Sequence, residues 1–106
     1  MFSNNEVIAE PVQPFVENGI STKISYVACG GKHSLALAND NVVYSWGNNQ
    51  YGQLGLALDE FESFHQPKEV LFFKEKIISN LGAGSYHSMA LSIEGYAYIW
   101  GRNDRG

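Results

Sequence analysis

The sequence has a single cysteine, Cys29, and this scarcity excludes several classes of protein. One cysteine cannot form a disulfide within the chain, so a disulfide-stapled secreted scaffold is excluded and a reducing compartment is favoured. A structural zinc site usually takes about four ligands in paired spacings. Cys29 with His33, His65 and His87 does not supply such pairs, so we expect no metal site. Cys29 stands in an apolar run and is predicted to be a small core residue.

Positive charge and long apolar runs are also scarce. The sequence has seven Lys and Arg residues and eleven Asp and Glu residues, which gives a formal net charge of −4 at pH 7. Phosphate backbones are bound by basic faces, so we expect no direct nucleic-acid binding. No apolar run approaches the roughly 18 residues of a membrane-spanning helix, and the first ten residues lack the pattern of a signal peptide. We therefore expect no membrane span and a cytoplasmic or nuclear location.

Proline is scarce and glycine is abundant, with three prolines and eleven glycines in 106 residues. This balance favours many tight turns between short strands. The hydrophobic fraction of 44% is ordinary for a globular chain, and the length allows one domain at most. Residues 1–10 are polar, and we expect them to form a loose N-terminal segment.

The sequence repeats itself after 54 residues. Lys23–Gly52 aligns with Ile77–Gly106 without a gap, and the identical pairs include His33/His87 and Trp46/Trp100. A period near 50 residues with strand-type patterning is typical of a propeller or a similar array. We expect a first repeat over about 24–76 and a second, truncated repeat over 77–106.

Each repeat is predicted to hold three short strands, at 24–29, 33–38 and 42–46 in the first copy. Leu35 and Leu37 alternate with small residues, which would let a neighbouring sheet approach closely. The turn Asn39–Asn41 consists of residues that tolerate positive φ, so 33–46 is predicted to be a β-hairpin. We also expect Pro67 to begin a further strand at Glu69–Phe73.

Few residues are arranged for chemistry. The run from Gly30 to Ser34 resembles a phosphate-binding loop but lacks its first glycine and the hydroxyl residue after lysine. His33 and His87 recur, and we expect them to hydrogen-bond to backbone and to hold adjacent turns together rather than to act as general bases. Trp46 and Trp100 are predicted to fill the space between adjacent sheets, with ligand stacking as the alternative. We expect no cofactor.

Three aromatic residues follow the first hairpin and have no counterpart in the second copy. They are Tyr51, Phe61 and Phe64. If exposed, they are candidate partner contacts, because aromatic residues are enriched at interfaces. The alternative is that they pack their own loop onto the protein.

The repeated motif resembles the repeats of the regulator of chromosome condensation family. The resemblance is carried by Val27–Gly30, His33–Leu37, Val43–Gly47, Asn49 and Tyr51–Gly55, and the last of these completes the run W-G-x-N-x-x-G-Q-L-G. The second copy supplies Gly84, His87–Leu91, Tyr98, Trp100–Gly101, Asn103 and Gly106. The resemblance covers about residues 11–106.

The resemblance implies an all-β fold that forms part of a β-propeller, with about one and a half to two four-stranded antiparallel blades. Glycine, histidine and tryptophan positions transfer only as scaffold residues, and no catalytic residue transfers. The scaffold positions are Gly30, His33, Trp46, Gly47, Gly52, Gly55, Gly84, His87, Trp100 and Gly101.

The family includes nucleotide exchange factors for a small GTPase and the propellers of large ubiquitin ligases. We therefore expect a non-enzymatic protein-interaction module from a propeller regulator, with a small GTPase as the expected partner. One alternative is a propeller fragment of a HECT-type ubiquitin ligase, which would need a catalytic domain beyond these residues. Another is a truncated product without independent function.

The chain is short for such a propeller. About seven blades at a period near 50 would need about 350 residues, so we expect a fragment of a longer protein. Sheets with open edges expose unpaired strands. Self-association through open blade edges, up to a closed ring of several copies, is the alternative.

Overall fold

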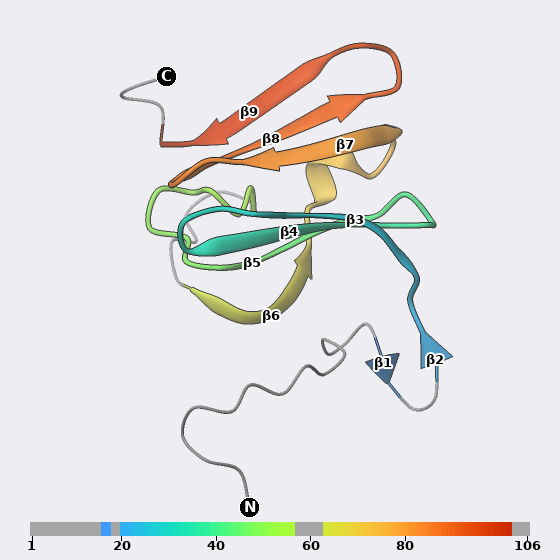
Figure 1. Cartoon of the computed structure of the whole chain (residues 1–106), viewed down its shortest axis with the longest axis horizontal. Coiled ribbons are helices and arrows are strands. Elements are labelled where there is room, and N and C mark those ends of the chain that lie inside the picture. The colour runs from blue at the N-terminus through green and yellow to red at the C-terminus, as the bar shows by residue number, and fades with distance from the viewer. Residues whose placement is uncertain (1–15, 18–19, 57–62, 103–106) are drawn as a thin grey trace, which may run out of the picture.

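The first blade of the protein is a four-stranded antiparallel β-sheet. The computed structural model describes residues 16–17, 20–56 and 63–102. Blade 1 is built in sequence order from β3 (Ile24–Cys29), β4 (His33–Ala38), β5 (Val43–Gly47) and β6 (Phe64–Glu69). The short pair β1 (Val16–Glu17) and β2 (Ile20–Ser21) precedes it (Figure 1). The predicted loose segment 1–10 lies outside the described residues.

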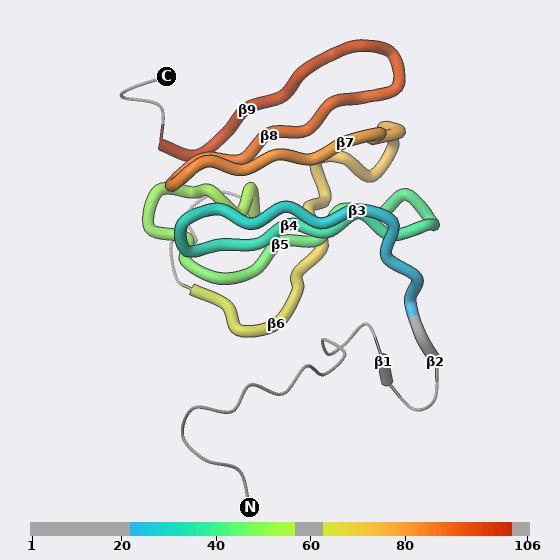
Figure 2. The backbone as a smooth tube through the Cα atoms, in the orientation of Figure 1, coloured from blue at the N-terminus to red at the C-terminus, as the bar shows by residue number. Residues whose placement is uncertain are grey.

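The second sheet repeats the first three strands. Blade 2 consists of β7 (Ile78–Ala83), β8 (His87–Ser92) and β9 (Ala97–Gly101), again antiparallel and in sequence order. The smooth backbone trace shows β7 running beside β3 and β4, so that one blade stacks on the other (Figure 2). The predicted all-β fold, a partial propeller of one and a half to two blades, is confirmed.

The registers of the two hairpins are the same after the 54-residue shift. In blade 1, Leu35 is opposite Ser45, and in blade 2, Met89 is opposite Ile99. The predicted hairpin at 33–46 is confirmed, and β8 and β9 form its equivalent in blade 2. Period-two alternation then gives each blade two distinct sides, because successive side chains of a strand point to opposite faces.

The core lies between the two blades. Blade 1 contributes Leu35, Leu37 and Val43 to it, and the side chains of Tyr98 and Trp100 pack against it from blade 2. Burying one such aliphatic side chain contributes about 1.5–3 kcal/mol. The remaining buried members are Val70, Phe73, Ile78, Leu81 and Ala90.

The predicted strand at Glu69–Phe73 is wrong. The strand is β6, and Pro67 lies inside it, while Leu71–Phe73 forms one turn of 3-10 helix, η1. β6 is the outer strand of blade 1, where a residue without an N–H group is tolerated. The backbone N–H of Val70 still donates to Val43 O at 2.8 Å, and η1 then places the Phe73 ring in the core between the blades.

The prediction that Cys29 is a core residue is also wrong, because its side chain is exposed. Its neighbour Ala28 packs against the core that blade 1 shares with blade 2. Because side chains alternate along β3, Cys29 faces the opposite side of blade 1. The equivalent residue in blade 2, Ala83, is on the side that packs against the core. No helix among the described residues is long and apolar enough to span a membrane.

Candidate interaction surface at the loop end of the blades

Three connections gather at one end of the two blades, which we name the loop end. They are the β3–β4 turn, the loop at 48–56 after β5, and the β7–β8 turn (Figure 1). The backbone N–H of Gly31 in blade 1 lies 3.3 Å from both Gly84 O and Ser85 O in blade 2. These hydrogen bonds join the two turns, so the loop end is one continuous surface made by both blades.

The 48–56 loop is fixed by its own buried side chains. The Oε1 atom of Gln53 accepts a hydrogen bond from Tyr51 N at 2.9 Å, and its Nε2 donates to Asn48 Oδ1 at 3.0 Å. Asn49 Oδ1 accepts a hydrogen bond from Leu54 N at 3.0 Å. Buried polar groups that find partners in this way specify one loop conformation. The turns of this loop need positive φ, which glycine adopts without strain, at Gly47, Gly52 and Gly55. Gly101 of blade 2 also has positive φ.

The same loop is bonded to both blades. Within blade 1, the Ser45 hydroxyl donates to Leu54 O at 2.6 Å. From blade 2, the Ser88 hydroxyl donates to Gln53 O at 2.6 Å and Trp100 Nε1 donates to the same oxygen at 3.0 Å. The loop therefore serves as the joint between the blades and holds its outer surface in place.

Trp100 also explains the glycine at position 55. A Cβ atom at Gly55 would lie 2.7 Å from Trp100 Nε1, and φ at this residue is +69°. The indole ring therefore fills the space between the blades where the chain of blade 1 has no side chain. Trp46, the equivalent residue in blade 1, is half-buried on the opposite side of that blade.

The side chain of His33, on β4 of blade 1, forms hydrogen bonds with blade 2. Its Nε2 atom lies 2.9 Å from Ser88 Oγ and 3.1 Å from His87 O. The Ser88 hydroxyl already donates to Gln53 O, so His33 Nε2 carries the proton and donates to both oxygens. Nδ1 is then unprotonated, and it is buried without a hydrogen-bond partner. Burial lowers the pKa of His33, which keeps the ring neutral.

Gly30 allows His33 to adopt this position. A Cβ atom at Gly30 would lie 2.2 Å from Cε1 of the His33 ring. Blade 2 repeats the arrangement, since a Cβ atom at Gly84 would overlap Cε1 of the His87 ring. Each glycine is needed because the histidine ring lies directly against the backbone. The structure thus places both recurring histidines against the backbone of their own turns, with His33 buried and His87 half-buried.

The outer surface of the loop end carries an aromatic and basic cluster, which we name the rim cluster. The rings of Tyr51 and Tyr86 meet edge to face, with centroids 5.0 Å apart. The Arg102 guanidinium lies 5.0 Å from the Tyr51 centroid and 5.7 Å from that of Tyr86. Cations at these distances are attracted to aromatic faces. Arg102 remains exposed, so the cluster presents a positive charge held between two tyrosines.

Three aromatic residues were predicted as partner contacts, and the structure describes two of them. Tyr51 lies in the rim cluster, Phe64 lies on β6 beneath the Lys68 ammonium at 5.3 Å, and Phe61 lies outside the described residues. Sequence reasoning missed Tyr86 and Arg102. The signal was the difference between the repeats, since Lys32 and Asn48 stand at these positions in the first copy.

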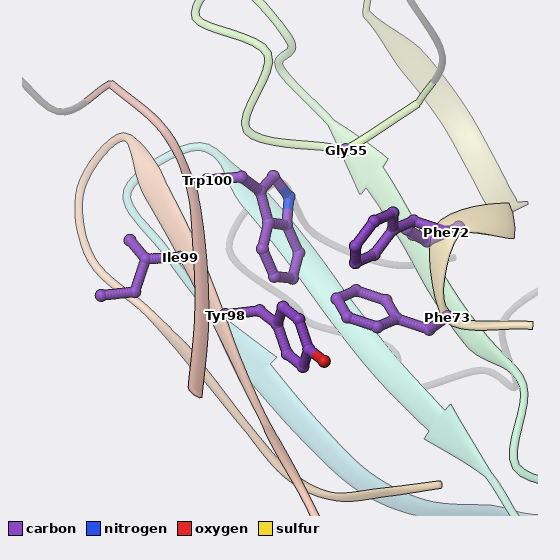
Figure 3. Close-up of a pocket in the computed structure, with 7 residues that line it drawn as sticks. Gly55, Phe72, Phe73, Tyr98, Ile99 and Trp100 are labelled. Atoms are coloured by element: carbon purple, nitrogen blue, oxygen red, sulfur yellow. The ribbon is translucent and has the colours of Figure 1, made fainter. Parts of the chain in front are cut away.

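An apolar pocket lies between the blades beside β9. It has a volume of about 290 Å³, and its lining is almost wholly apolar. Phe73 packs in it against Tyr98 and Trp100, with centroids 5.5 and 5.2 Å apart (Figure 3). The pocket offers apolar packing and little hydrogen bonding. Across the part of the chain that the structure describes, three or more metal-binding side chains nowhere come together.

Family models match both repeats. One described as the regulator of chromosome condensation (RCC1) repeat matches residues 40–91, and a second of the same description matches residues 24–53 and 78–106. The human probable E3 ubiquitin-protein ligase HERC6 is 45% identical over 84 residues, which are 79% of this chain and 8% of that protein. Protein RCC1 of Candida albicans is 36% identical over 86 residues, or 76% of this chain and 18% of that protein.

Solved structures agree with the family models. Prp20p from Saccharomyces cerevisiae superposes with a TM-score of 0.69 at 35% identity, over 81% of this chain and 20% of that one. The structure of Prp20p was described together with its binding properties to Gsp1p and histones. Human WBSCR16 superposes with a TM-score of 0.66 at 26% identity. The chain thus spans a fifth or less of Prp20p and of the two relatives above, and it belongs to the family of regulator of chromosome condensation (RCC1) repeat proteins.

Proposed function

We propose that this chain is a non-enzymatic protein-interaction module and that its loop end is the binding surface. The observation that carries the proposal is the rim cluster of Tyr51, Tyr86 and Arg102, held on a loop that both blades fix. Tyrosine and arginine are enriched among residues that dominate binding energy at interfaces. A preordered surface also binds without the cost of ordering its loops. The proposed module covers residues 11–106, in a nuclear or cytoplasmic protein.

The proposed partner is a small GTPase. Relatives of the chain include the guanine nucleotide exchange factor SRM1 of Saccharomyces cerevisiae, at 37% identity over 83 residues. Lys32 gives the loop end exposed positive charge although the chain as a whole carries −4. Such charge would meet carboxylates of a partner and speed the encounter.

The test is a calorimetric titration of the full chain with nucleotide-free Gsp1p, whose binding is described for Prp20p. We expect binding, and we expect Arg102→Ala to weaken it by about 30-fold, which corresponds to about 2 kcal/mol at a dominant contact. Lys76→Ala is the matched control. Its ammonium lies 4.4 Å from the Phe72 centroid, away from the rim cluster.

The control should bind like the wild type. Absence of binding by the wild-type chain would reject the GTPase partner. Equal losses in Arg102→Ala and Lys76→Ala would reject the rim cluster as the contact and would indicate general electrostatic attraction. Both variants need melting curves that match the wild type, so that a loss of affinity is not a loss of folding.

A second candidate is the substrate-binding propeller of a HECT-type ubiquitin ligase. The observation that favours it is the 45% identity to HERC6, which exceeds the 36% identity to Protein RCC1. The mass of the native polypeptide that contains the peptide around Trp46 tests it. Under this candidate the polypeptide carries a HECT domain after the repeats, and a polypeptide with RCC1-type repeats alone contradicts it.

A further inference from the structure

The hydrogen bonds of the loop end form one continuous series that begins at a titratable ring. His33 Nε2 donates to the hydroxyl of Ser88, which donates to Gln53 O, and Trp100 Nε1 donates to the same oxygen. The side chain of Gln53 in turn accepts a hydrogen bond from the backbone N–H of Tyr51, a member of the rim cluster. The position of the rim cluster therefore depends on a serine that is bonded to His33.

A second proton on His33 would find no acceptor. The side chain is 3% exposed, and its Nδ1 atom is buried without a hydrogen-bond partner. This atom lies against Gly30, where an added Cβ would be 2.6 Å from Nδ1. Protonation would therefore place both an unpaired N–H group and a positive charge in a buried site, and both are costly.

The segments packed around the ring offer no carboxylate to offset that charge. They are the β3–β4 turn, the 48–56 loop, the β7–β8 turn and the ends of the neighbouring strands, and none of them contains Asp or Glu. Their titratable and charged residues are Cys29, Lys32, Tyr51, Tyr86, His87 and Arg102. Burial is the main cause that lowers the pKa of His33, and the charge of the neighbouring His87 acts in the same direction.

The opposite end of the contact between the blades is held by a side chain that does not titrate. There the β4–β5 turn meets the start of β7 (Figure 1). Asn41 Nδ2 donates to Lys76 O, and Asn41 Oδ1 accepts a hydrogen bond from Ile78 N at 3.1 Å. The carboxamide of asparagine keeps its donors and its acceptor at every ordinary pH. The two ends of one contact therefore differ in their response to acid.

We propose that the loop end is a pH-sensitive joint, in which protonation drives the His33 ring out of its buried site and releases the 48–56 loop from blade 2. The core between the blades and the Asn41 end stay closed. Tyr51 then separates from Tyr86 and Arg102, the members of the rim cluster that belong to blade 2.

The direction of the effect follows from linkage. In the open form the ring is in water, where the ordinary histidine pKa of about 6.5 applies, so the open form takes up a proton more readily than the closed form. Opening is therefore favoured as the pH falls below about 6.5. Weaker partner binding in acid is a consequence that rests on the proposed function of the loop end, whereas the opening is a property of the chain alone.

Hydrogen exchange of the full chain, followed by NMR between pH 7.5 and 5.5, tests the joint. The indole N–H of Trp100 and the backbone N–H of Gly31 report the loop end, and the backbone N–H of Ile78 reports the Asn41 end. Rates are corrected for the intrinsic pH dependence of exchange. We expect protection at the loop end to fall by about tenfold, the factor given by an open-state pKa of about 6.5 and a ring that stays neutral when closed. Protection of Ile78 should stay constant.

Two variants identify the group responsible. His33→Gln keeps a side-chain N–H donor but cannot be protonated in this range, so its loop-end protection should not depend on pH. His87→Gln is the matched control at the recurring position of blade 2, and it should keep the decline of the wild type. The comparison of the two ends in the wild type does not depend on the folding of either variant.

Three results would overturn the proposal. Constant protection of Trp100 in the wild type would show that the loop end does not open in acid. An equal decline at Ile78 would show that acid separates the blades as a whole. A decline that persists in His33→Gln would assign the opening to another group. The measurement needs no partner, so a chain that fails to bind Gsp1p still tests the joint.

Discussion

The Nε2 atom of His33 lies 2.9 Å from the hydroxyl oxygen of Ser88, which is 55 residues further along and in the other blade. The same hydroxyl donates to Gln53 O, so one serine links a strand of blade 1, the loop and blade 2. The hydrogen bond therefore connects three parts of the fold that are distant in sequence.

Ser88→Ala should lower the free energy of unfolding by about 1–3 kcal/mol, because it removes two buried hydrogen bonds. His33 Nε2 then loses one acceptor and Gln53 O loses one donor. Urea unfolding measures the change. Ser79→Ala is the control, since Ser79 makes an exposed hydrogen bond to Leu91 O at 3.2 Å. A change within about 0.5 kcal/mol is expected there. Equal losses in both variants would contradict the role of Ser88.

Stability should fall as the pH drops below about 6.5, the ordinary pKa of histidine. Burial lowers the pKa of His33 in the folded protein, so the unfolded chain takes up its proton first. The contribution is complete above pH 6.5 and is lost as the pH falls toward the lowered pKa. Melting temperatures between pH 5 and 7.5 measure it, and His33→Gln should show a shallower decline. An unchanged slope in that variant would assign the dependence to other groups.

Gly84→Ala should destabilise the protein by about 1–3 kcal/mol, as for overpacking, because the new methyl group would overlap the His87 ring. The cause is tested by a double-mutant cycle with His87→Ala. The three atoms nearest to the added methyl group all belong to that ring, so removing the ring opens the space and the alanine should then cost much less at position 84. Additive losses in the double variant would show that the backbone, and not the ring, opposes a side chain there.

Trp100→Ala should cost about 3 kcal/mol, the lower end of the range for truncating a large aromatic residue. Trp100 packs against the core between the blades and donates to Gln53 O, whereas Trp46 is outside that core. Trp46→Ala should therefore cost less than Trp100→Ala. Chemical unfolding of the two variants under the same conditions gives the comparison. An equal loss would contradict this ranking of the two tryptophans.

The strands at 33–38 and 87–92 could be predicted because large apolar and small residues alternate in both copies of the repeat, and each copy therefore indicates a strand. The outer strand could not, because a proline predicts the start of a strand, whereas the open edge of β6 tolerates Pro67 inside the strand. Cys29 was misplaced for a related reason. Its apolar surroundings predicted burial, but which side of β3 is covered depends on a neighbouring blade.

The candidate site was only partly predictable. Tyr51 was identified from its aromatic ring, whereas Arg102 joins it only because two repeats stack with their turns at one end. The hydrogen bonds to the backbone oxygen of Gln53 could not be predicted either. The sequence motif does not indicate that this oxygen accepts hydrogen bonds from two side chains of the next blade. Contacts between repeats depend on stacking geometry, which a single repeat does not encode.

The two side chains that converge on Gln53 O have a consequence for cooperativity. Ordering the loop of one blade and docking the next are a single event, because the carbonyl loses both donors when blade 2 separates. In repeat proteins, stability is divided between each unit and its interface with its neighbour. Here a large share belongs to the interface, so the blades should melt together as one transition and a partner bound at the loop should raise the stability of both.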